Sequence, residues 1–219
     1  MYVPPFFKTD AASALEFAHA RGFGTLVAVD GQCPTAVRVP FIVEHDASGA
    51  TRIECHVARA NPIHKIITAA PSVLLTIDGP DAYISPDWYI AEDQVPTWNY
   101  VSVHIAGEAR LLPTEQIRGH VDRLSARFEA DLLPKKPWLT DKMTEPKLRA
   151  MLSAIQVIEI AVTTVEASRK LSQNKNRTDR VAVSQMLRWR GGWRESEIAE
   201  FMDTTLRQDF QSEQPKENV

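Results

Sequence analysis

Cysteine is scarce in this chain, and its scarcity argues against two classes of structure. Only Cys33 and Cys55 occur among the 219 residues, and they do not form a C-x-x-C pair. A zinc site built on thiolates is therefore not expected, and neither is a disulfide-stapled scaffold. We expect both cysteines to be small, buried or half-buried side chains of a protein that works in a reducing, cytoplasmic environment.

Other signals of familiar chemistry are also missing. The sequence has no H-x-x-x-H or H-E-x-x-H pair, no G-x-S-x-G, no G-x-G-x-x-G and no P-loop. Metal, hydrolase and nucleoside-triphosphate interpretations lose their usual support. The apolar runs are far shorter than the ~20 residues of a membrane span. The first residues, MYVPPFFKTD, lack the basic start and apolar run of a signal peptide, so we expect no membrane partner.

Charge of one sign is not in excess either. Lys+Arg 25 against Asp+Glu 28 gives a formal net charge of −3, whereas a chain held mainly by nucleic-acid phosphates is usually basic. A local basic patch remains compatible with this balance. A hydrophobic fraction of 44% and a charged fraction of 24% are ordinary for a globular protein.

Alternation of apolar and polar residues predicts most of the secondary structure. In Trp98–Leu111, Val101 and Val103 fall on one face, whereas Ser102 and His104 fall on the other. The other predicted strands are Phe23–Val29, Thr35–Glu44, Arg52–Ala58, Ser72–Ile77, Ala82–Ser85 and Gln156–Val165. The predicted helices are those ending near Arg21 and Ala70, one opening at Thr114, and Glu145–Leu152, Thr178–Trp189 and Arg194–Leu206.

Prolines are expected to interrupt two of these strands. Pro40 cannot donate to a ladder, so Thr35–Glu44 is expected to be an edge strand or to carry a bulge. Asp78-Gly79-Pro80 is expected to end the strand that begins at Ser72.

The elements predict a mainly β protein with helices, of the α+β class: a β-barrel decorated by helices. We expect three parts in the chain. Residues 1–170 form the barrel domain, and residues 171–210 form a loop and a helical pair that pack on the barrel or on a second chain. Residues 211–219 read as a disordered tail.

The stretch HVARANP, at residues 56–62, is the strongest candidate site. A strand ends there, Arg59 follows, and Asn61-Pro62 opens a short helix. Amide groups at a helix start and a guanidinium together suit a phosphate, and Lys65 in the first turn adds charge. The alternative is that Asn61 only caps the helix while Arg59 pairs with a surface acid.

Two further stretches carry polar and aromatic side chains. PTWNY, at residues 96–100, offers Trp98, Asn99 and Tyr100 to stack on and hydrogen-bond a flat heterocycle, or else closes one end of the barrel. KLSQNKNR, at residues 170–177, offers cations, a hydroxyl and amides, or else is a solvated basic loop.

The histidines divide into two groups by predicted position. His19, His45 and His120 are expected at the surface and inert. His56 and His104 are placed on strands, His64 at a helix start, and a metal site would need the fold to bring such residues together.

Taken in order, MYVPPFF, FGTLV, HVARANP, GPDAYISPDWY, VPTWNYVSVH and KLSQNK resemble the PaiB family of FMN-binding-type proteins, which are described as negative transcriptional regulators. The likeness extends to about residue 206. It implies a Greek-key-like, FMN-binding split β-barrel of the kind shared with pyridoxamine-phosphate oxidases and flavin reductases. It also implies a homodimer with flavin at the subunit interface, and a helical C-terminal extension.

The resemblance also implies roles for individual residues. The FMN phosphate would be bound by Arg38, Arg59 and Asn61. The backbone of His56, Val57 and Ala58 would run along the isoalloxazine, Trp98, Asn99 and Ser102 would flank it, and Lys170, Ser172 and Gln173 would close the site, from the partner chain in one arrangement. Arg38 and Cys55 stand where the family pattern has His and Gly.

Three functions are left open. One is a flavin-binding regulator, one an FMN-dependent oxidoreductase, and one a haem-binding split barrel with a His ligand. The C-terminal helical pair is the candidate for binding DNA, but its second helix carries Glu195, Glu197, Glu200 and Asp203, which would repel phosphates. The regulatory interpretation therefore rests on the resemblance.

Overall fold

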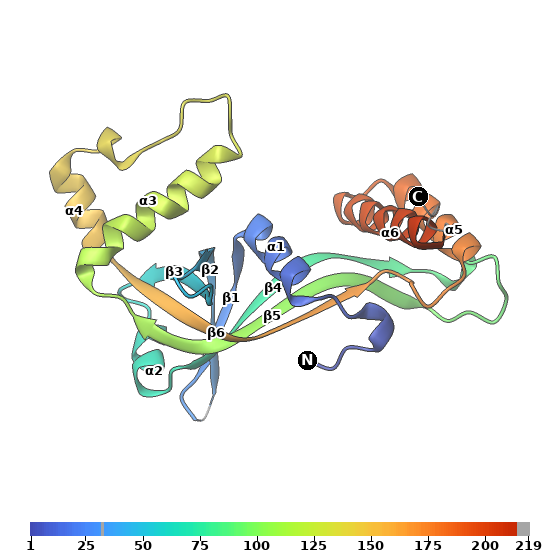
Figure 1. Cartoon of the computed structure of the whole chain (residues 1–219), viewed down its shortest axis with the longest axis horizontal. Helices are drawn as coiled ribbons and strands as arrows, with labels where there is room; N and C mark the ends of the chain where they lie inside the picture. The colour runs from blue at the N-terminus through green and yellow to red at the C-terminus, as the bar shows by residue number, and fades with distance from the viewer. Residues whose placement is uncertain (32, 214–219) are drawn as a thin grey trace, which may run out of the picture. The chain divides into compact units, whose positions relative to one another are not determined.

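The computed structural model describes residues 1–31 and 33–213 (Figure 1). Six strands are present in these residues: β1 Phe23–Val29, β2 Pro34–His45, β3 Thr51–Ala58, β4 Ser72–Ile84, β5 Thr97–Leu111 and β6 Ile155–Lys170. The helices are α1 Ala11–Arg21, α2 Ile63–Ala69, α3 Thr114–Ala130, α4 Glu145–Ser153, α5 Arg177–Arg190 and α6 Trp193–Glu213, with short 3-10 turns η1 Pro5–Phe7, η2 Pro86–Trp88 and η3 Thr140–Lys142.

The strands close into a barrel in the order β1-β2-β3-β6-β5-β4. β1 pairs antiparallel with β2 and β4, and β3 pairs antiparallel with β2 and β6. Because β6 lies between β3 and β5, the order is not sequential, as in a Greek key. The predicted α+β barrel with a helical C-terminal extension is confirmed.

The chain divides into two compact units, each built from several segments. The barrel unit consists of Ala11–Ile77 and His104–Val165. The extension unit consists of Met1–Asp10, Asp78–Val103 and the residues from Glu166 onward. The long strands β4, β5 and β6 each contribute to both units. The proposed domain boundary at residue 170 stays a prediction.

The core of the barrel unit comes from one face of each strand. Leu26, Phe41, Ile53, Leu75 and Ile158 are each at most 1% exposed. Along β1 and β4 the buried residues alternate with more exposed ones, because successive side chains of a strand point to opposite faces. On β6, residues 156–160 are all buried. On β3 the inward face includes Cys55, and burial raises the pKa of its thiol to about 12. Cys33 is exposed beside the β1–β2 turn, so the expectation that both cysteines are at least half-buried is wrong for it.

The two prolines behave differently from each other. Pro40 is the last β2 residue paired with β1, opposite Phe23, and pairing with β3 begins at Phe41. The residue without an amide donor thus lies where β2 changes partner, as its chemistry requires. Pro80, in contrast, does not break a strand, because β4 runs without interruption from Ser72 to Ile84. β4 pairs with β1 only over Val73–Thr76. The hydrogen-bonded ladder between these two strands therefore ends before Pro80.

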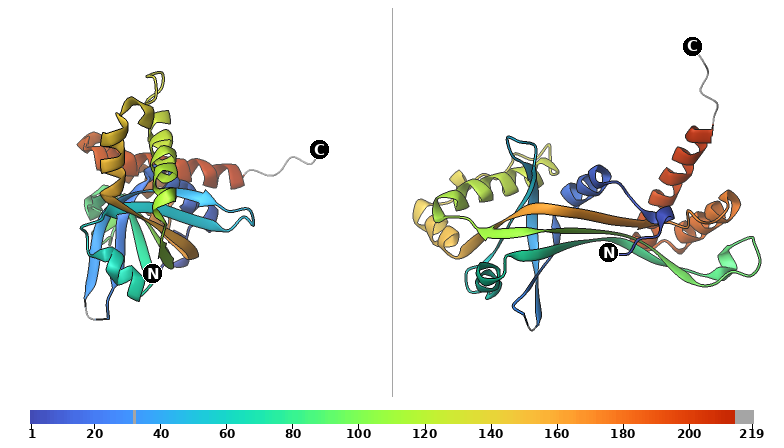
Figure 2. Two further views of the ribbon diagram at one scale, coloured as in Figure 1. Left: turned by 90° about the vertical axis from the view of Figure 1, so that its left-hand side faces the viewer. Right: turned by 60° about the horizontal axis from the view of Figure 1, so that its bottom comes forward.

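Helices α3 and α4 lie side by side in both views of Figure 2. In the extension unit, α5 and α6 pack together and bury Val183, Leu187, Ile198 and Met202. Gly191 closes α5 with φ 70, a left-handed conformation that glycine adopts without a Cβ penalty.

The end of the chain differs from expectation. Helix α6 continues to Glu213, so residues 211–213 are helical rather than part of a disordered tail. Residues 214–219 lie outside the described residues. Among the helices that the structure describes, none combines the length and apolarity needed to cross a bilayer.

Gly107 on β5 is the clearest test of barrel packing. A Cβ at this position would lie 2.2 Å from the main-chain oxygen of Ala161 and 2.7 Å from a methyl carbon of Ile160. Gly107→Ala is expected to lower the free energy of unfolding by about 1 to 3 kcal/mol, because a backbone atom cannot move aside. Urea denaturation followed by circular dichroism measures this.

Gly119→Ala is the matched control. Gly119 lies within α3, where a Cβ would meet only the flexible end of Arg123 at 3.3 Å. Alanine is the better helix former by about 1 kcal/mol, so this variant is expected to be neutral or stabilised. Equal losses for the two variants would contradict the packing argument.

Candidate functional site

The predicted phosphate site begins where β3 ends. Asn61 accepts a hydrogen bond at 3.0 Å from the amide of Ile63, the first residue of the short helix α2, and so satisfies one free amide at the helix start. Arg59 binds around the carboxyl end of α4: its amide donates to Ala154 O at 2.8 Å, and its guanidinium donates to Ser153 O at 3.0 Å and Ile155 O at 2.9 Å. The partners of Arg59 are therefore carbonyls, not the surface acid of the alternative interpretation.

Arg38 lies on the outer, exposed face of β2. It donates to the hydroxyl of Thr25 at 3.2 Å and its guanidinium stacks 4.6 Å above the ring of Phe23. Both contacts orient the guanidinium through β1, the neighbouring strand.

The thirteen predicted flavin-site residues fall into the two units of the chain. Those in the barrel unit are Arg38, His56, Val57, Ala58, Arg59, Asn61 and Lys65. Those in the extension unit are Trp98, Asn99, Ser102, Lys170, Ser172 and Gln173. Their role as one site stays a prediction, and the two groups are described separately.

In the PTWNY stretch, neighbouring residues face opposite ways. Trp98 is 54% exposed and contacts Tyr83 edge-on, with ring centroids 5.9 Å apart. Asn99 is fully buried, where its amide donates to Ser172 Oγ at 3.0 Å and contacts the sulfur of Met202 at 3.5 Å. Trp98 and Asn99 therefore lie on opposite faces of β5 and do not flank one surface together.

The KLSQNK stretch is more ordered than a solvated basic loop. Ser172 is 3% exposed and has φ 62, an unusual conformation for a residue with a side chain. Gln173 folds back onto the main chain, donating to Arg169 O and accepting from the amide of Leu171. Lys170 donates to the hydroxyl of Thr97 at 2.6 Å. Lys170 and Ser172, but not Gln173, line a cavity of about 180 Å³.

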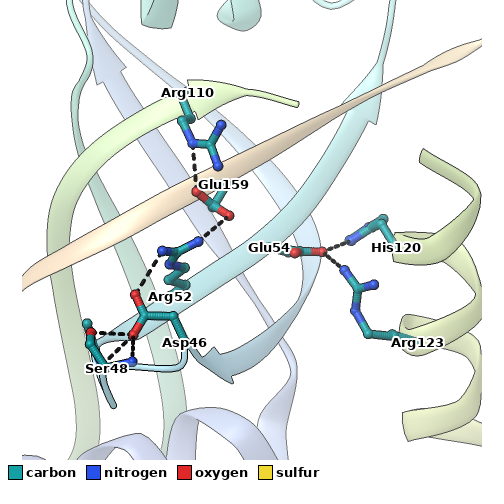
Figure 3. Close-up of polar contacts among 9 residues, drawn as sticks. Asp46, Ser48, Arg52, Glu54, Arg110, His120, Arg123 and Glu159 are labelled. Atoms are coloured by element: carbon teal, nitrogen blue, oxygen red, sulfur yellow. Dashed lines mark hydrogen bonds and ion pairs between the residues drawn. The ribbon is translucent and has the colours of Figure 1, made fainter. Parts of the chain in front are cut away.

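A buried polar chain on the outer face of β3 was not predicted. His120 of α3, expected at the surface, is 0% exposed. Its Nδ1 lies 3.1 Å from Glu54 Oε2, and its Nε2 lies 3.0 Å from Nδ1 of His56. Arg123 donates to the same carboxylate at 2.5 Å (Figure 3). The Nε of Arg123 also lies 3.3 Å from Glu44.

The chemistry of Glu54 fixes the direction of these hydrogen bonds. A carboxylate only accepts, so Nδ1 of His120 carries a proton. In neutral His120, Nε2 then accepts from Nδ1–H of His56, which leaves Nε2 of His56 as a base. The hydrogen bond from His120, together with Arg123, holds the pKa of Glu54 below its usual value although burial raises it. This series of hydrogen bonds thus links the buried carboxylate of Glu54, through His120, to the half-buried imidazole of His56.

A second group of charges lies nearby on the strands (Figure 3). Glu159 accepts from Arg110 at 2.7 Å and from Arg52 at 3.4 Å, and Arg52 also pairs with Asp46 at 2.8 Å. Chiefly the hydroxyl of Ser48 lowers the pKa of Asp46 to about 2. Every charge in this group is compensated, which indicates a structural role.

Burial of His56 predicts a pH-dependent stability. Burial, and then the charge of His120, lower the pKa of His56 from 6.5 to about 4. Between these values the unfolded chain binds a proton that the folded chain does not, so stability falls as the pH falls through this window. After allowance for the partly exposed ring we expect a loss of about 2 kcal/mol. Urea denaturation at several pH values measures it.

His56→Gln should remove part of this dependence, whereas His45→Gln should keep it, because His45 is exposed in the same unit. The other charged groups at His56 and His120 are Glu54, Arg123 and Glu44, and loss of the Glu54 charge adds to the decline only at lower pH. The same slope in both variants would contradict the assignment.

Four of the six arginines of the C-terminal helices are paired with acids. The pairs are Arg180–Asp209 at 2.5 Å, Arg188–Asp203 at 2.5 Å, Arg190–Glu195 at 3.4 Å and Arg194–Asp81 at 3.4 Å. This pairing lowers the positive potential that phosphates would meet at the helical pair. Among the described residues, no cluster of three or more His, Cys, Asp or Glu side chains is arranged to hold a metal ion.

Solved structures with the same fold define its class. The chain aligns with the FAD and haem binding protein of Mycobacterium smegmatis at a TM-score of 0.55 and 14% identity, covering 84% of this chain and 80% of that one. It aligns with the flavocytochrome Anf3 of Azotobacter vinelandii at a TM-score of 0.51 and 15% identity, covering 77% and 72%. The fold is the split β-barrel, as expected.

Sequence comparison then gives the family. Residues 1–164 match the family described as "Putative FMN-binding domain". The chain is 33% identical over 213 residues to the Bacillus subtilis protein named "Protease synthase and sporulation protein PAI 2", covering 96% of this chain and 100% of that protein. The chain belongs to the PaiB family of split-barrel proteins of the FMN-binding type.

Proposed function

We propose that this protein is a PaiB-type transcriptional regulator that binds FMN and works as a homodimer. The observation that carries the proposal is the full-length match to the Bacillus relative, which includes the C-terminal helices as well as the barrel. A flavin-binding fold alone hosts many functions. A sequence match over nearly the whole chain supports a shared role better than a match to the barrel alone would.

The donors in the barrel unit suit a phosphate. The Arg59 guanidinium is exposed and fixed by carbonyls through Nε and one Nη nitrogen. Because carbonyls are neutral, these bonds orient the guanidinium without cancelling its charge. Lys65, exposed in α2, supplies a second cation a short distance along the chain. Arg59, Lys65 and Asn61 would thus hold the FMN phosphate, and the bound flavin would supply electron-transfer chemistry.

The extension unit offers exposed aromatic side chains to a second copy of the chain. Trp189 and Trp193 flank the Gly191-Gly192 turn and are 79% and 66% exposed. Such residues are favoured where a partner covers them. Because the arginines beside them are paired with acids, we do not assign major-groove reading to this helical pair.

Titration of the full-length protein with FMN and riboflavin tests the flavin part. Arg59→Ala and Lys65→Ala should each weaken FMN binding about tenfold, the size of one charge-assisted hydrogen bond, and leave riboflavin affinity nearly unchanged, because riboflavin has no phosphate. Arg149→Ala, which removes an exposed arginine of α4, is the control and should bind FMN like the parent. Isothermal calorimetry and flavin absorbance report both affinities.

Arg59→Lys separates charge from folding, because it keeps the cation but loses the paired hydrogen bonds at α4. Equal losses for FMN and riboflavin in Arg59→Ala would indicate a distorted barrel. Absence of FMN binding in the parent would refute the flavin proposal. Light scattering tests the homodimer, and a gel shift on promoter DNA at several salt concentrations tests regulation.

One observation favours a second function, an FMN-dependent oxidoreductase. The Glu54–His120–His56 chain presents a base at Nε2 of His56, where a proton can be taken up or released. NAD(P)H oxidation with added FMN tests this function, and His56→Gln should reduce its rate. Turnover without DNA binding would favour the oxidoreductase over the regulator. Haem binding by a His ligand stays a prediction, which a Soret band after addition of hemin would test.

A further inference from the structure

A cavity in the extension unit has the features of a small-ligand site. It has a volume of about 180 Å³, below the range of about 300 to 1,000 Å³ that drug-sized ligands occupy. Its wall is formed by Phe7, Tyr89, Val95, Thr97, Asn99, Lys170, Ser172, Asn174 and Lys175. These residues come from the N-terminal segment, the loop before β5, and the KLSQNK stretch, all within one unit.

Two lysines bring positive charge to this cavity without acidic partners. Lys170 donates to the hydroxyl of Thr97, and Lys175 donates to the side-chain oxygen of Gln94, each at 2.6 Å. Their ammonium groups lie 5.9 Å from the ring centroid of Phe7 and 5.2 Å from that of Tyr89. Among the described residues, no carboxylate pairs with either ammonium. An ammonium has three donors, so each lysine can still bind an anion.

The hydroxyl of Tyr89 is a second group that a ligand in this cavity could bind. Tyr89 is 8% exposed, and its hydroxyl has no hydrogen-bond partner among the described residues. It lies near Ser172 without the geometry of a hydrogen bond, and burial raises its pKa, so it stays protonated at neutral pH. A buried hydroxyl without a partner is costly, unless a ligand satisfies it.

The carboxylate of Asp179 does not take the place of a ligand in this cavity. Asp179, which faces Tyr89 from α5, accepts from the amides of Ile90 and Ala91 and from Asn176. Its carboxylate is therefore committed to holding the loop. Phe7, Tyr89 and Val95 supply the apolar part of the cavity wall.

We propose that this cavity binds a small organic carboxylate, with the anionic group at Lys170, Lys175 and the Tyr89 hydroxyl and the apolar body against Phe7 and Val95. FMN is far too large to fit in it. The proposed ligand is an effector of the protein. Asn99, Lys170 and Ser172 are also among the predicted flavin-site residues, so its binding is tested in the absence of flavin. The residues named above for the cavity wall all belong to the extension unit.

Calorimetric titration of the full-length protein with benzoate and with benzamide tests the proposal. Benzamide has the same shape without the charge, so it should bind at least tenfold more weakly than benzoate. Lys170→Gln and Lys175→Gln should each weaken benzoate binding about tenfold. Lys147→Gln, which changes an exposed lysine of α4 in the barrel unit, should leave it unchanged.

Tyr89→Phe gives a readout that does not depend on charge. It removes only the hydroxyl, so it should weaken benzoate binding several-fold, while the unliganded protein should unfold at the same or a higher temperature. Loss of thermal stability would instead indicate a hydroxyl that the fold itself uses, and would overturn the assignment.

Other outcomes also decide the matter. Benzoate that fails to bind, binds no better than benzamide, or binds equally to the Lys170 and Lys175 variants refutes the proposal. So does inorganic phosphate binding in place of benzoate, or displacement of benzoate by FMN. Because the flavin test uses Arg59 and Lys65, a failure there leaves the benzoate result unaffected.

Discussion

Replacing Glu54 by alanine is expected to lower the free energy of unfolding by about 3 to 5 kcal/mol. His120 would lose the acceptor of its Nδ1–H while staying fully buried, and Arg123 would lose its shortest ion pair. Removing one member of a buried charged group costs more than the group contributes as a whole, because the others stay desolvated. Urea denaturation at neutral pH, followed by circular dichroism, measures the loss.

Glu44→Gln is the matched control, because Glu44 contacts the same Arg123 from a more exposed position, at 3.3 Å. Exposed ion pairs contribute little, so we expect a loss below about 1 kcal/mol. Glu54→Gln keeps one acceptor for His120 and should fall between the two. A loss for Glu54→Ala no larger than that of Glu44→Gln would show that His120 finds water or another partner.

Most strands of the barrel could be predicted from the sequence, because a strand's buried residues form a pattern that is visible within a few neighbouring positions. The apolar run Phe23–Val29 and the alternation in Arg52–Ala58 predicted these strands within one residue at each end. The Asp78-Gly79-Pro80 break was wrong for a tertiary reason: a proline disrupts a strand only where its edge is paired, and local sequence does not show where pairing with β1 ends.

The sequence does carry a signal for the burial of His120. This residue follows Ile117 by three residues and precedes Leu124 by four, the spacing of one face of a helix. Its burial with Ile117 follows from that spacing. The partners of His120 could not be predicted, because Glu54 and His56 lie on the outward face of β3. Only the packing of α3 onto that face buries them.

For the candidate ligand-binding residues, too, the sequence predicts which face of a strand a residue lies on but not which residues it contacts. Alternation along β5 alone places Asn99 with Val101 on the buried face and Trp98 on the other. The partners of Asn99, Ser172 and Met202, come from segments more than seventy residues away. Which side chains meet around the Tyr89 hydroxyl depends on such long-range contacts, so sequence patterns identified the KLSQNK stretch but not the cavity it helps to form.

Asp179→Ala is expected to destabilise the protein by about 3 kcal/mol. Asp179 is 1% exposed and accepts three hydrogen bonds, from the amides of Ile90 at 2.7 Å and Ala91 at 3.0 Å and from Asn176 at 2.8 Å. It thus joins the start of α5 to the loop that carries Tyr89. Hydrogen bonds to a charged group each contribute about 1.5 to 3 kcal/mol, and the exposed loop amides regain part of this from water.

Hydrogen exchange makes the Asp179 prediction specific to the loop. The amides of Ile90 and Ala91 should exchange faster in Asp179→Ala, and by more than global unfolding accounts for, because their acceptor is gone. Asp179→Asn keeps one acceptor oxygen for both amides, but its NH₂ would face that of Asn176, so about half of the loss is expected. Glu92→Gln, an exposed acid on the same loop, should change neither stability nor exchange. Unchanged exchange at Ile90 in Asp179→Ala would mean that the loop is held by its apolar contacts, and that the position of the Tyr89 hydroxyl does not depend on α5.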